Sequence, residues 1–230
     1  MTYLDTYLTE CGFPYRRART AREVIAAGMG DIPQVQDQQY HALRDRLVQT
    51  MAPILPRSAE LFAEHTWDAA VLVNTNNGSS VAGYLACSET EYDAQYARLW
   101  IGGPPNSEPA ASSELPPDLL RFSREVHSGF LWDGEGAGPL GTDGAGWTFR
   151  ERCGGSAPDW WDDAAFGDIE SFLVVMPSYW WDSVYCSTGP HDVLTLIDPH
   201  LPDDRVRRVG TFAEEADSLM CRVITEDAVR

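Results

Sequence analysis

The chain has 230 residues, of which 35 are aspartate or glutamate and 17 are basic, giving a formal net charge of -18. Every basic residue is arginine, and the absence of lysine excludes a P-loop and Schiff-base catalysis, which both need an amine. The negative charge repels the phosphates of nucleic acids, so we predict no nucleic-acid partner, and no motif indicates a cofactor.

Length and composition are typical of a globular protein. A hydrophobic content of 43% is far from that of disordered chains, and a chain of this length can bury a sizeable core. The N-terminus lacks a signal-peptide pattern, and no apolar run reaches about 18 residues, so we expect a soluble, cytoplasmic protein with no membrane partner. Nothing specifies an oligomeric state. The five cysteines include no C-x-x-C pair and indicate reduced thiols: Cys11, Cys87, Cys153, Cys186 and Cys221.

The N-terminal part of the chain is predicted to be helical. Thr20 and Glu23 have the spacing of a capping box, in which each side chain bonds the other's free main-chain amide, and they predict a short helix ending near Gly28. Residues 58–65 predict another short helix. Between them, a longer helix is predicted from residue 35, because apolar residues recur at steps of three and four: Tyr40, Leu43, Leu47, Met51 and Ile54.

The pattern then changes to one typical of strands. Residues 69–74 and 80–87 are apolar runs, and residues 75–79 between them contain Asn and Gly, which tolerate the conformations of a hairpin turn. Residues 97–101 are expected to pair beside this hairpin.

A segment rich in Pro, Gly and Ser follows at residues 102–113 and predicts a surface loop or linker. It separates two regions. Residues 1–103 are predicted to form helices plus a β-hairpin, and residues 114–225 to form an α+β region. The first region is either a separate domain or part of the same domain as the second.

The second region combines two helices with three strands. Pro116 begins a helix with Leu119, Phe122 and Val126 on one side, and Gly129 is predicted to be its left-handed C-terminal cap. A capping box at residues 211–214 predicts the final helix. Strands that are grouped, instead of alternating with helices, predict an α+β fold with a largely antiparallel sheet flanked by helices. The three strands are predicted at residues 170–176, 183–187 and 193–198.

The glycine-rich residues 133–144 match neither a calcium loop nor a phosphate cradle. Ala137 and Gly144 stand where a calcium loop needs acidic ligands. The segment also lacks the preceding strand and the lysine that a phosphate cradle needs. Because glycine repeats mostly provide backbone freedom, we predict a flexible surface loop and no metal site.

One cluster of residue types could serve nucleophilic catalysis. Cys186 is followed by His191 and Asp198, and a catalytic thiolate needs a base and a third group that orients the base. These residues give an alternative hypothesis of a small cysteine-dependent hydrolase or transferase. A buried structural thiol fits the pattern better, since cysteine is often buried. His191, Asp198 and His200 lack the spacing of a specific metal site.

Tryptophans beside acidic residues are the most distinctive feature of the second region. In a strand, adjacent tryptophans point to opposite faces, so one of each pair is expected near the surface. Exposed indoles often anchor protein interfaces, and nearby carboxylates attract a basic partner. The alternative is that these segments only close the core at loop ends. The candidate binding residues are Trp132, Asp133, Glu135, Trp160, Trp161, Asp162, Asp163 and Trp181.

Residues 114–130 resemble the leucine-proline, helix and glycine signature of the SUKH superfamily, with Leu115, Pro116, Asp118, Phe122 and Gly129 at the matching positions. The stretch at 138–140, the strand end at 196–198 and the closing helix from Phe212 are similar to the family's layout.

The resemblance covers about half of the chain and implies an α+β immunity-type protein without catalysis. Our leading hypothesis is therefore an antitoxin-like protein that binds and neutralises a basic toxin domain of the nuclease or deaminase type. A nuclease-like toxin has a basic cleft for phosphates, which an acidic surface can cover. A regulatory scaffold protein is a further alternative.

Overall fold

The computed structural model describes residues 2–33, 36–89, 96–106, 114–132, 136–141, 147–178, 182–190 and 193–225. It contains two antiparallel sheets with helices packed against them, which confirms the predicted α+β class. The first sheet has the order β1-β2-β3-β4-β5, and the second has the order β6-β7-β8-β9. The strands are β1 (Tyr15–Arg17), β2 (Thr66–Asn74), β3 (Ser80–Ala86), β4 (Arg98–Gly102), β5 (Phe130–Trp132), β6 (Leu173–Pro177), β7 (Val184–Ser187), β8 (Val193–Ile197) and β9 (Val206–Thr211).

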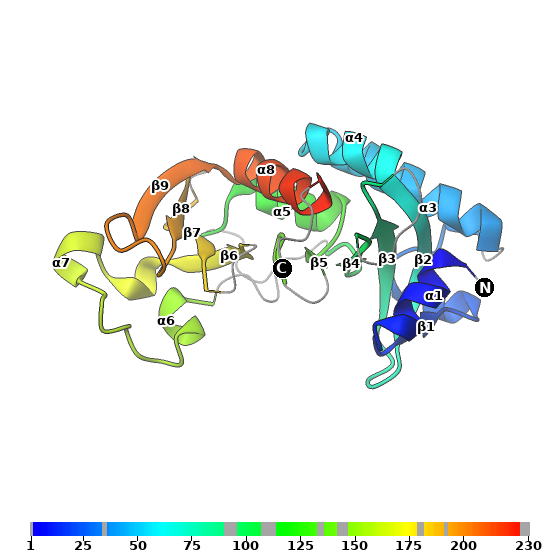
Figure 1. Cartoon of the computed structure of the whole chain (residues 1–230), viewed down its shortest axis with the longest axis horizontal. Helices are drawn as coiled ribbons and strands as arrows, with labels where there is room; N and C mark the ends of the chain where they lie inside the picture. Colours follow the sequence, from blue (N-terminus) through cyan, green and yellow to red (C-terminus); the bar gives the residue numbers. More distant parts are fainter. Residues whose placement is uncertain are drawn as a thin grey trace.

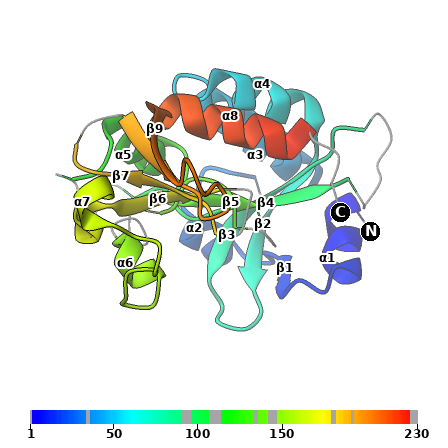
Figure 2. The same ribbon diagram turned by 60° about the vertical axis from the view of Figure 1, so that its left-hand side comes forward.

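Helices cover both faces of the sheets. Figures 1 and 2 show α3, α4 and α8 together along one side of the molecule, and α5 shares their hydrophobic core. The helix α1 packs on the opposite face of the first sheet, and α6, α7 and the short 3-10 helix η1 lie beside the second. The bounds are α1 (Tyr3–Glu10), α2 (Ala21–Ala26), α3 (Gln36–Met51), α4 (Pro56–His65), α5 (Pro117–Glu125), α6 (Phe149–Arg152), α7 (Asp163–Phe166), η1 (Ile169–Ser171) and α8 (Phe212–Thr225).

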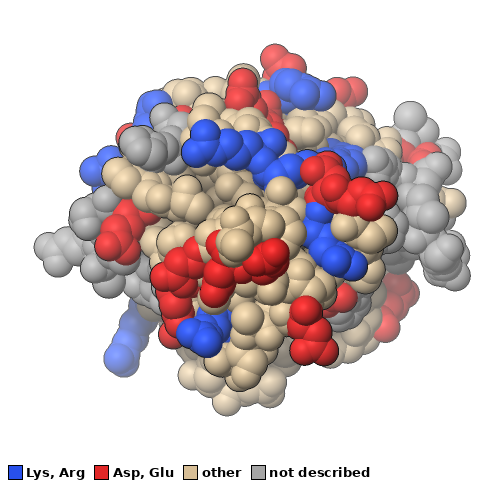
Figure 3. All heavy atoms as spheres, turned by 90° about the vertical axis from the view of Figure 1, so that its left-hand side faces the viewer, with Lys and Arg blue, Asp and Glu red and all other residues tan. Residues whose placement is uncertain are grey.

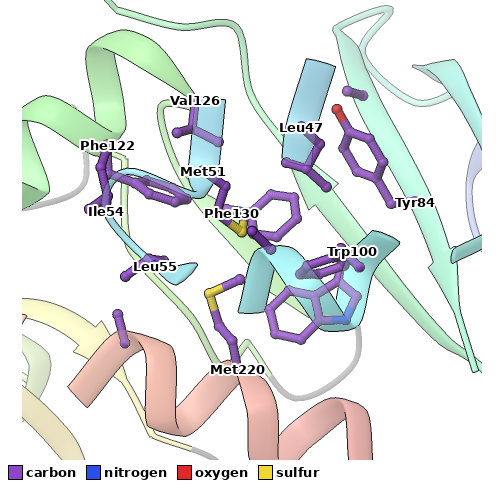
Figure 4. Close-up of a cluster of buried hydrophobic side chains, with 14 of the residues drawn as sticks. Leu47, Met51, Ile54, Leu55, Tyr84, Trp100, Phe122, Val126, Phe130 and Met220 are labelled. Atoms are coloured by element: carbon purple, nitrogen blue, oxygen red, sulfur yellow. The ribbon is translucent and has the colours of Figure 1, made fainter. Parts of the chain in front are cut away.

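The largest hydrophobic cluster draws residues from both halves of the chain. Figure 4 shows Leu47 of α3 and Met220 of α8 in one cluster with Trp100 and Phe130, whose rings stack at a centroid distance of 5.3 Å. Burial of these side chains is the main source of stability, and it requires both halves to be folded together. The shared core favours the single-domain alternative for residues 1–103 and 114–225.

A buried carboxylate fixes α8 against α4. The helix α4 begins after Leu55, which has no side-chain acceptor for the free amides of the first turn. Asp217 of α8, only 7% exposed, supplies that acceptor: the main-chain amide of Ser58 donates to it at 2.7 Å and that of Arg57 at 3.3 Å. Its negative charge also suits the positive end of the helix dipole.

The residues 136–141, which we call the connecting strip, join the two sheets. On one side, Phe130 of β5 donates its amide to the carbonyl of Pro139 at 2.9 Å, and Trp132 donates to Ala137 at 2.9 Å. On the other side, Gly138 donates to Pro177 of β6 at 3.3 Å, and Leu140 donates to Val175 at 3.0 Å. The strip therefore occupies the position of a strand between β5 and β6.

This arrangement corrects the prediction that residues 133–144 form a flexible surface loop. Ala137, Gly138 and Pro139 are buried, and the strip is bonded on both sides. A Cβ atom at Gly138 would lie 2.3 Å from the carbonyl oxygen of Phe130, so glycine is required there for close approach of two main chains. Residues 133–135 and 142–146 lie outside the described residues.

The local predictions agree with most elements. The hairpin of β2 and β3, the neighbouring strand β4 and the capping boxes at Thr20 and Thr211 are confirmed. Gly129 has a positive φ of 79°, as expected, but α5 ends at Glu125, so this glycine turns the chain toward β5 and does not cap the helix. Among the described residues, no helix is both long and apolar enough to span a bilayer.

The strip gives a direct stability test. We expect Gly138→Ala to lower the free energy of unfolding by at least about 3 kcal/mol, because the new methyl group would clash with a main-chain carbonyl. Gly136→Ala is the matched control, since Gly136 also has a positive φ but a Cβ atom there would meet nothing within 4 Å. Its cost should be about 1 kcal/mol, from backbone strain alone. Urea unfolding measures the free energy of unfolding of both variants, and equal decreases for Gly138→Ala and Gly136→Ala would contradict the role of the strip.

Candidate functional site

Six exposed carboxylates gather around α6, α7 and η1, and we call this region the acidic surface. Residues 147–178, which contain all six, have only two arginines, Arg150 and Arg152. Figure 3 views this end of the molecule and shows acidic side chains in several places, with the broadest group below a row of arginine side chains and next to a further arginine. The six residues are Glu151, Asp159, Asp162, Asp163, Asp168 and Glu170.

Trp160 and Trp161 lie within the acidic surface, and both are half-buried. They belong to a turn before α7, so the expectation that adjacent tryptophans of a strand face opposite sides does not apply. Their rings are 5.8 Å apart, and Trp161 also contacts Phe172 edge-to-face at 5.3 Å. Arg205 of the segment before β9 lies over Trp160 at 5.3 Å. These contacts show that both indoles close a small hydrophobic core, as the alternative interpretation expected.

Several acids of this surface also stabilise the local fold. Asp162 accepts a hydrogen bond from the amide of Ala164 and caps α7, and Asp163 accepts one from the indole of Trp161 at 3.0 Å. Asp168 caps η1 in the same way. Asp159, by contrast, forms no hydrogen bond or ion pair with other described residues. Its charge therefore serves no visible structural purpose within the described chain.

Trp147 is the most exposed tryptophan in the described part of the chain. Its side chain is 62% exposed, and its carbonyl accepts a hydrogen bond from Val174 of β6 at 2.8 Å. The capping box of Thr148 and Glu151 follows directly and orients the start of α6. Trp147 was not among the predicted binding residues because no acidic residue or second tryptophan adjoins it in the sequence. The Thr-x-x-Glu pattern that follows it, from Thr148 to Glu151, does predict an ordered position.

The remaining candidates do not join this surface. Trp132 of β5 packs against the main core, and Arg98 lies over its ring at 5.3 Å. Figure 1 shows β5 near the middle of the molecule and α7 at one end. Asp133, Glu135 and Trp181 lie outside the described residues. The structure thus brings together Trp160, Trp161, Asp162 and Asp163 and separates them from Trp132.

The thiol of Cys186 is unsuited to catalysis. Cys186 on β7 is completely buried in the hydrophobic cluster of Phe149, Phe172 and Val174, and burial raises the pKa of its thiol. A catalytic cysteine needs the opposite, an accessible thiol with a lowered pKa. His191 lies outside the described residues, so the geometry of the predicted pair is not part of the structure. The burial of Cys186 agrees with the interpretation of a structural thiol, and the cysteine-dependent enzyme stays an alternative prediction.

A second buried titratable group lies between α5 and β5. His127 is 1% exposed; its Nδ1 donates to the carbonyl of Gly103 at 2.9 Å, and its Nε2 then accepts from the hydroxyl of Tyr84 at 3.0 Å. Burial lowers the pKa of His127 to about 4. Both ring nitrogens are used and no solvent reaches them, so this pair supports the fold.

Taken together, the described residues define an α+β protein with an acidic surface that carries tryptophans. No group of three histidine, cysteine or acidic residues within the described ranges could hold a metal ion. Comparison with known proteins finds no family model, no curated protein and no solved structure that matches this chain. The resemblance of residues 114–223 to the SUKH superfamily therefore stays a prediction.

The cysteines provide a test of the enzyme alternative. With iodoacetamide near neutral pH, we expect Cys11, which is exposed, to be alkylated in the folded protein while Cys186 stays protected until the protein unfolds. Peptide mapping by mass spectrometry over time measures both sites in one sample. Labelling of Cys186 as rapid as that of Cys11 would contradict its burial and restore the enzyme hypothesis.

His127 gives a pH dependence with a defined sign. Its pKa is about 4 in the folded protein and near 6.5 in the unfolded chain, so between these values the unfolded state binds more protons and the fold loses stability as pH falls. From pH 7.5 to pH 5 we expect this group to lower the free energy of unfolding by about 2 kcal/mol. His127→Gln should be less stable at neutral pH, but its stability should lack this dependence on pH. Urea unfolding at pH 7.5 and pH 5 measures the change for each protein, and an equal change in wild type and His127→Gln would contradict the assignment.

Proposed function

We propose that this protein is a non-catalytic, antitoxin-like binding protein whose acidic surface covers the basic site of a toxin domain of the nuclease or deaminase type. The observation that carries the proposal is the group of six exposed carboxylates around α6, α7 and η1 with only two arginines in the same segment. Enzymes that act on nucleic acids hold phosphates with arginine and lysine. A rigid array of carboxylates is complementary to such a site.

The rigidity of the array supports this role. Asp162, Asp163 and Asp168 are held by hydrogen bonds to nearby amides or to an indole, so their charges have set positions before a partner arrives. Pre-positioned charges cost less ordering entropy on binding than mobile ones, and complementary potentials speed association.

Trp147 supplies the apolar anchor that such an interface needs. Tryptophan is enriched among residues that contribute most to binding energy, and 62% of this side chain is free to be covered by a partner. It directly precedes Thr148 and Glu151, which places it beside the acidic surface. An exposed indole with neighbouring carboxylates fits a basic protein surface better than a small-molecule substrate. A regulatory scaffold would differ only in the partner that it binds.

The partner can be identified by affinity capture from native cells with the full-length chain, followed by mass spectrometry. We expect a protein with a basic nucleic-acid- or nucleotide-processing domain whose activity falls when the purified chain is added. Recovery of an acidic partner, or of a toxin whose activity is unchanged in the complex, would contradict the proposed function.

Two substitutions locate the interface on the captured partner. Asp159→Arg should lower the association rate constant about three- to tenfold, and Trp147→Ala should raise the dissociation rate constant at least about tenfold. Neither residue stabilises the described fold, so the thermal midpoint of the free protein should stay unchanged. Glu60→Arg, on the exposed side of α4, changes the net charge equally and is the control. Wild-type kinetics for both test variants would remove the acidic surface from the interface.

A further inference from the structure

We propose that the cleft between α7 and β9 binds a small anion carrying a flat apolar group, such as an aryl carboxylate or an aryl phosphate. The cleft has a volume of about 370 Å³, which is within the range of small-ligand sites. It lies at the same end of the molecule as the acidic surface, but its walls have a different chemistry. The proposal does not rest on the identity of the protein partner.

The walls of the cleft carry arginine and no carboxylate among the described residues that line it. Arg207 and Arg208 of β9 line it together with the hydroxyl-bearing residues Ser171, Thr188 and Thr195. Two other pockets of the described chain include acids: Asp5 lines the one beside α1, and Asp31, Asp45 and Glu125 line the one beside α3. In a chain with 35 carboxylates, a cleft that none of the described ones lines lowers the short-range repulsion that an anion meets.

Arg208 and Thr195 lie directly opposite each other on β9 and β8, so their side chains project from the same face of the sheet. Thr195 is only 7% exposed, and its hydroxyl has no hydrogen-bond partner among the described residues. Arg208 is exposed and forms no ion pair within the same part of the chain, whereas Arg207 is paired with Asp204 at 2.8 Å. Within the described chain neither the Arg208 guanidinium nor the Thr195 hydroxyl has a partner, so the two can donate together to an anion.

Two aromatic rings also line the cleft. Phe172 is 5% exposed and contacts Trp161 edge-to-face at 5.3 Å, and the half-buried Phe166 of α7 contacts the same indole at 5.5 Å. Aromatic rings favour flat apolar groups through stacked or edge contacts. The combination of an arginine, a hydroxyl and aromatic rings selects a ligand with an anionic end and a planar end.

The test is an NMR titration of the full-length, isotope-labelled protein at about 0.15 M salt, which screens the long-range repulsion of the negative chain. The probes are phenyl phosphate, benzoate and neutral phenol. We expect at least one anion to shift the amide signals of Thr195, Val206 and Arg208 with a Kd on the order of millimolar. Phenol should bind about tenfold more weakly. The anion with the lower Kd identifies the preferred head group.

Arg208→Gln should weaken binding of the better anion about tenfold, while Arg19→Gln, an exposed arginine outside the cleft, should leave it unchanged. Because Arg208 is exposed, its variant should keep the wild-type pattern of amide signals away from the cleft. Three results would each overturn the proposal: no shift at about 20 mM of either anion, equal binding of phenol, or wild-type affinity in Arg208→Gln.

Discussion

The connecting strip is the constraint on which the rest of the architecture depends. Its carbonyls at Ala137 and Pro139 accept hydrogen bonds from β5, while its amides at Gly138 and Leu140 donate to β6. The strip thereby joins the edge strand β5 of the first sheet to the edge strand β6 of the second. The helix α8 packs beside α4, where Asp217 caps the first turn of α4. A side chain at Gly138 would separate β5 from the strip, so a single atom controls the joining of two sheets.

Charge is distributed by structural need as much as by function. Arg17, for example, stabilises the fold, since it forms ion pairs with Asp5 and with the nearly buried Asp68. Around α7 the arrangement differs, because this helix carries residues of the acidic surface and also borders the arginine-lined cleft. The net charge of -18 affects how a distant partner approaches. Binding at the acidic surface or in the cleft depends instead on the charged side chains of that site.

Much of the fold could be predicted from the sequence because the signals are local. The capping box of Thr20, the hairpin turn at residues 75–79 and the apolar spacing of α3 reflect contacts within a few residues. The strands β1, β5 and β9 and the helices α1, α6, α7 and η1 were missed. The first two strands have only three residues each, so they show no alternation, and β9 is rich in arginine.

The sequence by itself determined the negative charge, the absence of lysine and the positions of most helices and strands. Only the tertiary structure decided that residues 136–141 occupy a strand position with a buried centre, that Trp160 and Trp161 share one small core, and that Cys186 is buried. It also decided that Trp147 is the exposed indole. The physical reason is that burial depends on which distant segments cover a side chain, and composition and spacing carry no record of that packing.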